Sequence, residues 1–349
     1  MVKITEISQA NAAFAKQGRE GLVFVFAGAT SGIGAATLEK LASMVRSATF
    51  HVAGRSASRF ASQRARVEAV NPKLSIKFFE CDVSLLAGVD AFARSVVAAE
   101  SKVDYLFMSQ GKLPLAGAHY TSEALEAAFA LSYYSRMRLT SALLPLLQRA
   151  PQPRVLCVLN GGHEGALAED DLALAKPGAW SAGASMAHTT TLSTLALDLL
   201  SAKHTNITFL HAYPGLVRTG IAAAMAAPES AGWLGRTWVA VLRGLIGSFL
   251  WLVGTTAETA GERQAYHLTG LPVDGGERQP GRAVLVDDKS EIVRGTPVLA
   301  RYRAEGWPER VWEFTVGVFE SVVASASPSA PLYAAASTPA TAPASIRAG

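Results

Sequence analysis

A glycine-rich turn near the N-terminus restricts the fold of this chain more than any other feature. The apolar run at 22–27 is rich in residues that favour β-strands, and a helical pattern begins directly after the turn. The turn itself reads Gly28-Ala29-Thr30-Ser31-Gly32-Ile33-Gly34. Glycines let the backbone approach a pyrophosphate closely, and the N-terminus of the helix adds free N–H groups and a partial positive charge. The segment therefore predicts a nucleotide-binding strand, turn and helix.

The rest of the chain alternates strand-like and helix-like segments. Strand patterns lie at 22–27, 48–53, 75–81, 103–108, 154–159 and 207–213, and helical patterns at 35–45, 60–70, 87–100, 122–147 and 184–200. Alternation at this spacing predicts an α/β fold, a Rossmann doubly wound parallel sheet with helices on both faces.

The chain divides into three parts of different composition. Residues 1–20 read as a helical lead-in, and 21–323 as a single NAD(P)-binding Rossmann domain. Within that domain a hydrophobic segment around 225–255 is expected to cap the substrate pocket. Residues 324–349 are rich in Ala, Ser and Pro, which predicts a disordered tail.

Composition excludes several classes of protein. Two cysteines, Cys81 and Cys157, are too few for a disulfide framework or a metal site, and no apolar signal segment opens the chain, so we expect a cytoplasmic protein without metal. The net charge of +4 is scattered, which argues against a nucleic-acid partner. Arg236 and Arg243 interrupt the most hydrophobic stretch and argue against a membrane span, although weak contact with a membrane surface remains open.

The end of the second predicted strand indicates which cofactor the turn holds. Dinucleotide folds that prefer NAD place an acid there, which bonds the ribose 2′-hydroxyl and would repel a 2′-phosphate. This chain has Arg55 and Ser56 instead, with Arg59 close behind. An arginine can hold a phosphate through two hydrogen bonds, so the sequence favours NADP(H) over NAD. The alternative is that both arginines are solvated surface charges.

Several segments together resemble the short-chain dehydrogenase/reductase family over roughly residues 20–270. The turn at 28–34 is similar to the family's TGxxxGIG loop, with Ala27 in place of the leading Thr. Further similarities are Asp82-Val83 at the adenine loop, Ser109-Gln110-Gly111 in place of Asn-Ala-Gly, and Pro214-Gly215-Leu216-Val217-Arg218-Thr219 beside the nicotinamide. The resemblance implies a cofactor site formed by Gly28, Thr30, Ser31, Gly32, Ile33, Gly34, Arg55, Ser56, Asp82, Val83, Ser109, Gly111, Pro214, Gly215, Val217 and Thr219.

The same resemblance exposes a departure at the catalytic positions. The family uses Asn, Ser, Tyr and Lys, in which the Tyr exchanges a proton with the substrate oxygen and the Lys lowers the pKa of the Tyr. Alignment through Leu195-Ala196-Leu197-Asp198-Leu199 puts Ser181 at the Tyr position and Ser185 at the Lys position. Asn160 then stands at the Ser position and Ser132 at the Asn position. No Tyr-x-x-x-Lys occurs between residues 151 and 215.

Other groups near the predicted mouth of the site are able to supply a proton. His163 is the first candidate, because an imidazole is the side chain best suited to acid–base work near neutral pH, and a water held by Asn160, Ser181 and Ser185 is the alternative donor. Glu164 and His188 are weaker candidates. For Glu164 the alternative is a cap or an ion pair at the surface. The remaining candidates are Tyr133 and Tyr134, expected to serve packing, His211, expected to be a core strand residue, and Tyr213 at the end of the sixth predicted strand.

The segments at 158–165 and 211–215 resemble a divergent, fungal-type branch of the family, found with secondary-metabolite pathways. This resemblance implies a small hydrophobic substrate. We therefore expect an NADP(H)-dependent oxidoreductase with an atypical catalytic site. The alternatives are a redox-neutral isomerase or cyclase on the same scaffold and a non-catalytic NADP-binding protein. A homo-oligomer is compatible with the sequence.

Overall fold

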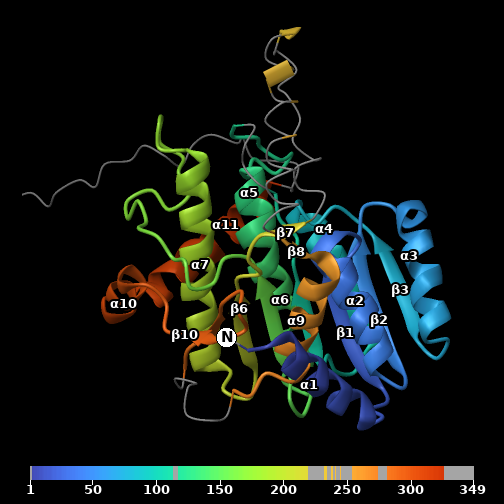
Figure 1. Cartoon of the computed structure of the whole chain (residues 1–349). Helices are drawn as coiled ribbons and strands as arrows, with labels where there is room; N and C mark the ends of the chain where they lie inside the picture. The colour runs from blue at the N-terminus through green and yellow to red at the C-terminus, as the bar shows by residue number, and fades with distance from the viewer. Residues whose placement is uncertain are drawn as a thin grey trace, which may run out of the picture.

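An eight-stranded sheet forms the centre of the molecule, and helices cover both of its faces (Figure 1). The computed structural model describes residues 2–112, 117–218, 254–273 and 281–325, together with isolated positions between 219 and 253. The expectations for Thr219, for most of the 225–255 segment and for nearly all of 324–349 lie outside the described residues.

The strand order is that of a doubly wound sheet. The strands are β1 Leu22–Ala27, β2 Ala48–Gly54, β3 Ser75–Glu80, β4 Tyr105–Met108, β5 Arg154–Val158, β6 Thr208–Ala212, β9 Val284–Val286 and β10 Ile292–Val293. They lie in the order β10-β9-β6-β5-β4-β1-β2-β3, and only β10 runs antiparallel to its neighbour. The order reverses between β1 and β4, which is where ligands bind in open sheets of this kind.

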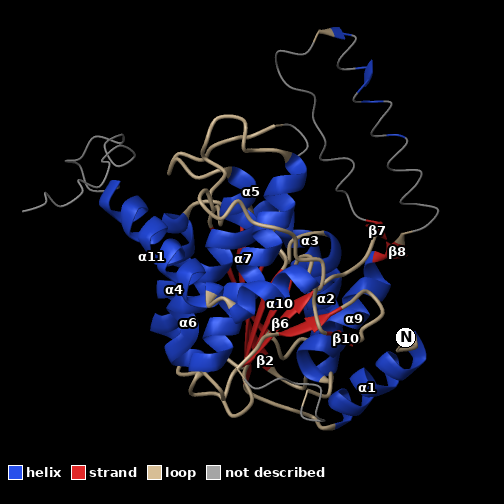
Figure 2. Ribbon diagram, turned by 90° about the vertical axis from the view of Figure 1, so that its left-hand side faces the viewer, coloured by secondary structure: helices blue, strands red, loops and turns tan. Residues whose placement is uncertain are grey.

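Helices from separate parts of the chain cover the two faces (Figure 2). One core contains residues of α1 Ile4–Lys16, α2 Gly32–Met44, α3 Ala57–Val70 and α9 Ala257–Thr269. The other contains residues of α4 Leu86–Ala99, α5 Ala127–Phe129, the π-helix η1 Ala130–Tyr134, α6 Ser135–Leu147, α7 Ala182–Lys203, α10 Pro297–Ala304 and α11 Trp307–Ser325. The predicted fold class is confirmed.

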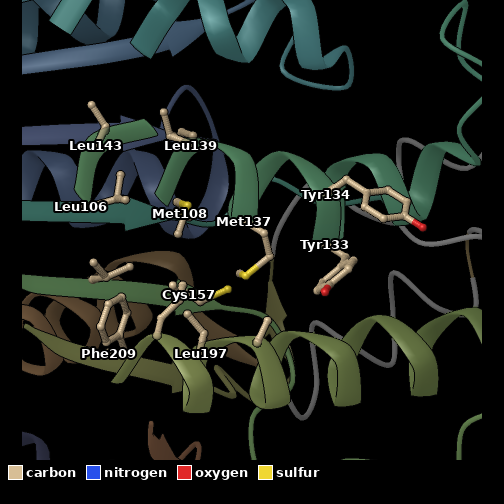
Figure 3. Close-up of a cluster of buried hydrophobic side chains, with 14 of the residues drawn as sticks. Leu106, Met108, Tyr133, Tyr134, Met137, Leu139, Leu143, Cys157, Leu197 and Phe209 are labelled. Carbon is tan, nitrogen blue, oxygen red and sulfur yellow. The ribbon is translucent and has the colours of Figure 1, made fainter. Parts of the chain in front are cut away.

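The central strand β1 is buried along its whole length, which explains its uninterrupted apolar sequence. Phe24 packs against Phe50 and Tyr105 on one face, with ring centroids 5.0 and 4.7 Å apart. On the opposite face, Met108 and Cys157 lie between the sheet and α6 (Figure 3). Burial of each large side chain stabilises the fold by about 1.5–3 kcal/mol, so these layers fix the strand ends that carry the site.

Two parts of the secondary structure differ from the sequence-based expectation. The helix expected at 122–147 starts only at Ala127, because Tyr120 and Glu126 pair as a β-bridge and Ala124 adopts a positive φ of 58°. Beyond β6 the structure contains β9, β10, α9, α10 and α11, for which no element was predicted.

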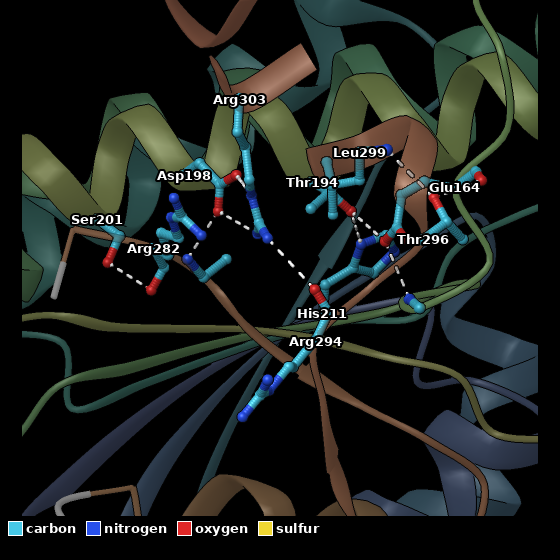
Figure 4. Close-up of polar contacts among 12 residues, drawn as sticks. Glu164, Thr194, Asp198, Ser201, His211, Arg282, Arg294, Thr296, Leu299 and Arg303 are labelled. Atoms are coloured by element: carbon cyan, nitrogen blue, oxygen red, sulfur yellow. Dashed lines mark hydrogen bonds and ion pairs between the residues drawn. The ribbon is translucent and has the colours of Figure 1, made fainter. Parts of the chain in front are cut away.

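The last two helices are attached to α7 by polar contacts. Arg303 of α10 binds both carboxylate oxygens of the buried Asp198, at 2.7 and 3.1 Å, and Asp198 also accepts the N–H of Ala283 at 2.9 Å (Figure 4). In α11, the hydroxyl of Thr315 bonds the hydroxyl of Tyr133. The end of the described chain is thus part of the core on the α7 face.

Candidate active site

The glycine turn brings the backbone of β1 against the loop that follows β4. Gly28 has a φ of +82°, and a Cβ on it would lie 2.2 Å from the backbone nitrogen of Gln110. A Cβ on Gly34 would lie 2.2 Å from the carbonyl oxygen of Gly28. No other residue fits at either position without moving the backbone.

The N-terminus of α2 is open beside this turn. Ser31 is the N-cap residue in an extended conformation, and its side chain makes no capping hydrogen bond. Thr30 and Ser31 are exposed, while Gly32 and Ile33 begin the helix. The first N–H groups of α2 are therefore free to bind an anion, which fits the pyrophosphate of a dinucleotide.

The loop after β4 is locked onto the glycine turn. Ser109 donates its hydroxyl to the carbonyl of Gly28 at 2.9 Å, and its N–H bonds the carbonyl of Ala27 at 2.9 Å. A Cβ on Gly111 would lie 3.8 Å from Ser132 Oγ, so the loop also reaches the position of the family's Asn. These contacts hold two predicted cofactor segments in one arrangement.

The end of β2 presents a free cationic side chain. Arg55 is exposed, and no described carboxylate lies within ion-pair distance of it. The hydroxyl of Ser56 caps α3 by accepting the N–H of Arg59 at 3.3 Å, and Glu80 accepts the N–H of Ala57 at 2.8 Å. Arg55 is thus available to a phosphate, as the sequence suggested.

Two further predicted cofactor segments form turns at the carboxyl edge of the sheet. Asp82 is exposed and accepts the N–H of Ser84 at 2.9 Å, while Val83 is partly buried against the core. After β6, Pro214 precedes Gly215, whose φ is +73°. Val217 then enters the short strand β7, Val217–Arg218, which pairs with β8, Thr255–Thr256.

Ser181 and Ser185, predicted to stand at the family's Tyr and Lys positions, lie in different surroundings. Ser181 is exposed and caps α7, because its Oγ accepts the N–H of Ala184 at 3.1 Å. Ser185 is buried, and its Oγ has no hydrogen-bond partner among the described residues. Asn160 is half-buried after β5. Within the described part of the chain no hydrogen bond joins these three side chains, so a water held by all of them stays a prediction.

Titratable side chains gather instead at the ends of β5, β6 and β9. His163 is exposed and packs edge-on against Tyr213, with ring centroids 4.3 Å apart. Asp288 follows β9, and its Cβ would lie 2.9 Å from a Cβ on Gly215. Burial, and to a smaller extent Asp288, raise the pKa of Tyr213, which keeps the phenol protonated. Tyr213, one of the titratable candidates at the end of the sixth predicted strand, thus lies beside His163.

A buried polar chain joins Glu164, Thr194 and His211 (Figure 4). Thr194 Oγ donates to Glu164 Oε1 at 2.9 Å and lies 2.8 Å from His211 Nδ1. The N–H of Asn160 donates to His211 Nε2 at 3.4 Å. Burial, with a contribution from Arg136, lowers the pKa of His211 to about 3, so the ring is neutral.

This chain of contacts corrects one expectation. Glu164 is 4 % exposed and also accepts the N–H of Gly162, so it has no surface role. The close approach of β6 explains its position, because a Cβ on Gly161 would lie 2.1 Å from the carbonyl oxygen of His211. His211 is a core strand residue, as predicted.

The other titratable candidates are held by structural contacts. His188 accepts the N–H of Ala168 at Nε2 and bonds the carbonyl of Leu172 through Nδ1, and burial lowers its pKa. Tyr133 and Tyr134 are buried, and burial raises the pKa of both phenols. These three side chains therefore support the loop and helices around the site.

One buried charge was missed by the sequence reasoning. Arg136 of α6 is completely buried and donates to the backbone at the end of β4. It lies three residues after Tyr133 and four before Thr140, and both of these side chains are buried. This helical spacing places Arg136 on the buried face of the helix, and it was the sequence signal for the burial of the charge.

The described residues provide neither a metal centre nor a membrane span. In this part of the chain no three His, Cys, Asp or Glu side chains are grouped so that they could hold a metal ion. None of its helices combines the length and the apolar character needed to cross a bilayer.

Comparison with known proteins gives relatives over nearly the whole chain. Residues 22–167 match the family described as short chain dehydrogenase. The protein named Oxidoreductase lepF, from Aspergillus flavus, is 35% identical over 334 residues, covering 86% of this chain and 92% of that protein. Oxidoreductase AN1596, from Emericella nidulans, is 31% identical over 344 residues, covering 93% and 99%.

Solved structures share the fold at low sequence identity. Levodione reductase aligns with a TM-score of 0.56 and 15% identity, covering 77% of this chain and 98% of that one. An NADPH-bound carbonyl reductase from chicken fatty liver aligns with a TM-score of 0.51 and 16% identity, covering 79% and 99%.

Proposed function

Because the chain belongs to the short-chain dehydrogenase/reductase family, we propose that this oxidoreductase uses NADP(H) to interconvert a small hydrophobic carbonyl compound and its alcohol. The observation that carries the proposal is the pairing of the glycine turn with Arg55. The turn leaves room for a pyrophosphate against the backbone, and Arg55 stands free at the end of β2, where an acid would favour NAD.

The residues that hold the cofactor follow from this arrangement. The open N–H groups at the start of α2 would bind the pyrophosphate, and Arg55 the 2′-phosphate. Gly111 and the turn at Gly215 would face the nicotinamide half. When bound, the reduced cofactor supplies a hydride to the carbonyl carbon, so the protein must orient the substrate and deliver one proton to its oxygen.

We assign that proton to the pair His163 and Tyr213. Both follow strand ends at the carboxyl edge, and their rings are in contact, so a proton on His163 lies next to a protonated phenol. Imidazole exchanges protons near neutral pH. The phenol of Tyr213 cannot do so alone, because its pKa is raised. His163 therefore takes the place of the absent family Tyr.

Exposed apolar side chains suggest the chemical class of the substrate. Tyr120, Met186 and Leu216 are 64%, 41% and 48% exposed, and they follow β4, begin α7 and follow β6. All three segments leave the carboxyl edge of the sheet, where a hydrophobic compound would find apolar contacts. The relatives from Aspergillus flavus and Emericella nidulans are named oxidoreductases, which supports redox chemistry, and a role in secondary metabolism stays a prediction.

The proposal is tested by oxidation of NADPH with a panel of hydrophobic aldehydes and ketones. We expect consumption of one NADPH for each alcohol formed. Substrate conversion without a change in nicotinamide absorbance would indicate the redox-neutral alternative. Tight NADPH binding without turnover of any compound would favour the non-catalytic alternative.

The cofactor preference gives a first prediction. Changing Arg55 to Glu should raise the dissociation constant of NADPH about 100-fold, because a charge-assisted hydrogen bond of roughly 2–3 kcal/mol is replaced by repulsion. Binding of NADH, which has no 2′-phosphate, should change less than about threefold.

Fluorescence titration of both cofactors measures this difference. Arg94→Glu, at an exposed arginine of α4, makes the same charge reversal away from the site and should leave both constants unchanged. Equal weakening of NADPH and NADH by Arg55→Glu would contradict the assignment.

The proton donor gives a second prediction. His163→Gln should lower kcat for carbonyl reduction by about 100-fold, which is typical for loss of a general acid. Ser181→Ala is the matched control, since Ser181 caps α7, and it should change kcat less than about threefold. An unchanged kcat in His163→Gln would exclude His163 as the acid.

A further inference from the structure

Arg136 is a buried cation at the carboxyl edge of the sheet. Its side chain is 0% exposed, which is unusual for a charged residue. Arg136 is the second residue of α6, which directly follows the π-helix η1. A buried charge of this kind is retained only where its surroundings or its function require it.

The hydrogen-bond partners of the Arg136 guanidinium among the described residues are all uncharged. Nη1 donates to the carbonyl of Met108 at 3.0 Å and to Cys157 Sγ at 2.9 Å, and Nη2 donates to the carbonyl of Gln110. Nε has no partner. Among the described residues no carboxylate lies within ion-pair distance of Arg136. The positive charge is therefore not neutralised by an ion pair.

The place of this charge connects it with the cofactor segments. Met108 ends β4, and Gln110 belongs to the loop that is locked onto Gly28. A Cβ on Gly111 would lie 4.0 Å from Arg136 Nη2. The guanidinium thus lies directly beneath the loop that, under the proposed function, faces the nicotinamide half of NADP(H).

The field of the charge reaches neighbouring groups. Besides burial, Arg136 lowers the pKa of His211, which lies at the end of the next-but-one strand. Screening by water is weak at such depth, so a like charge placed on the other side of the loop is also repelled.

We propose that Arg136 makes the site prefer reduced over oxidised cofactor, because its charge repels the positive nicotinamide ring of NADP⁺ and leaves the uncharged ring of NADPH unaffected. The proposal rests on NADP(H) being the cofactor. It makes Arg136 a positioning and electrostatic residue that favours carbonyl reduction over alcohol oxidation.

The test is the ratio of the dissociation constants of NADP⁺ and NADPH, measured by calorimetric titration without substrate. Arg136→Met removes the charge and should lower this ratio about tenfold, the order expected for like charges roughly 10 Å apart inside a protein. Arg136→Lys keeps the charge and should keep the ratio. A merely structural loss would weaken both cofactors equally and leave the ratio unchanged.

A second pair of variants leaves the arginine in place. Ser132→Asp puts a carboxylate beside the guanidinium, since Ser132 Oγ and Arg136 Nη2 lie near the same point of Gly111. It should lower the ratio about as much as Arg136→Met, whereas Ser132→Asn, of the same size, should not. Cys157→Ala removes one acceptor and should also leave the ratio unchanged.

The outcomes separate this inference from the proposed function. A ratio that is the same in the wild type, Arg136→Met and Ser132→Asp overturns the role of Arg136 while leaving NADP(H) as cofactor. A wild type that binds neither form overturns the proposed function itself.

Discussion

Replacing Gly28 with alanine will abolish measurable binding of NADPH and destabilise the fold. The new Cβ would lie 2.2 Å from the backbone nitrogen of Gln110 and 2.7 Å from its Cα, so the two loops must separate. The φ of +82° adds roughly 1–2 kcal/mol of strain for an alanine. We expect an increase of at least about 100-fold in the dissociation constant, since the pyrophosphate cradle loses its geometry.

The measurement is the rise in melting temperature when NADPH is added. Wild-type protein should show a clear rise, and Gly28→Ala none. Gly18 has a similar φ of +60°, but a Cβ there meets nothing within 4 Å, so Gly18→Ala is the matched control for backbone strain alone. Gly18→Ala should keep the full rise. A normal NADPH-induced rise in Gly28→Ala would show that this glycine is not part of a cofactor cradle.

Acidification from pH 7.5 to 5 should remove about 4 kcal/mol from the free energy of unfolding, before the carboxylates titrate. Burial lowers the pKa of both His211 and His267 to about 3, and both rings are shielded from solvent. Once unfolded, each would regain its ordinary pKa near 6.5.

The sign follows from proton binding. Between pH 6.5 and 3 the unfolded chain binds protons at these two positions and the folded chain does not, so stability falls as the pH falls. Over the first 1.5 units or so below 6.5, each histidine contributes about 2 kcal/mol, at 1.36 kcal/mol per unit. The melting temperature should therefore drop by roughly 6 °C between pH 7.5 and 5, since the entropy of unfolding grows with chain length.

Thermal melting across this pH range tests the prediction. His267 is the better target, because its Nε2 has no partner among the described residues, so His267→Gln should lessen the acid-induced loss of stability by about 2 kcal/mol. A melting temperature that stays constant between pH 7.5 and 5 in the wild type would contradict the buried neutral state of both rings.

The fold was largely readable from the sequence because its strands are bounded by local signals. β1 and β5 are apolar runs that end at glycine or follow proline, and the structure places them within a residue of the predicted ends. The short strands β9 and β10 carry no such signal. They are defined by pairing with distant segments, β9 with β6, which periodicity within a window cannot detect.

The site was predictable where chemistry depends on backbone geometry and less so where it depends on burial. Gly28 and Gly34 are required by a close approach that their spacing already indicated. Glu164 and Arg136 are charged residues whose burial is set by the packing of β6 and α6, so a sequence alone gives them solvated positions. The sequence predicts that Ser181 and Ser185 replace the family Tyr and Lys, but it gives no sign of the contact between His163 and Tyr213, which joins residues from two strand ends.

The attachment of α10 and α11 to α7 has a consequence for synthesis of the protein. As the chain leaves the ribosome, the binding half formed by β1 to β4 emerges long before Arg303 can reach Asp198 or Thr315 can reach Tyr133. Until then Asp198 of α7 lacks its ion-pair partner. The apolar side chains of α7 that pack with α10 and α11 also remain exposed. During this interval the nascent chain exposes apolar surface that is prone to aggregation, and chaperones would bind it then.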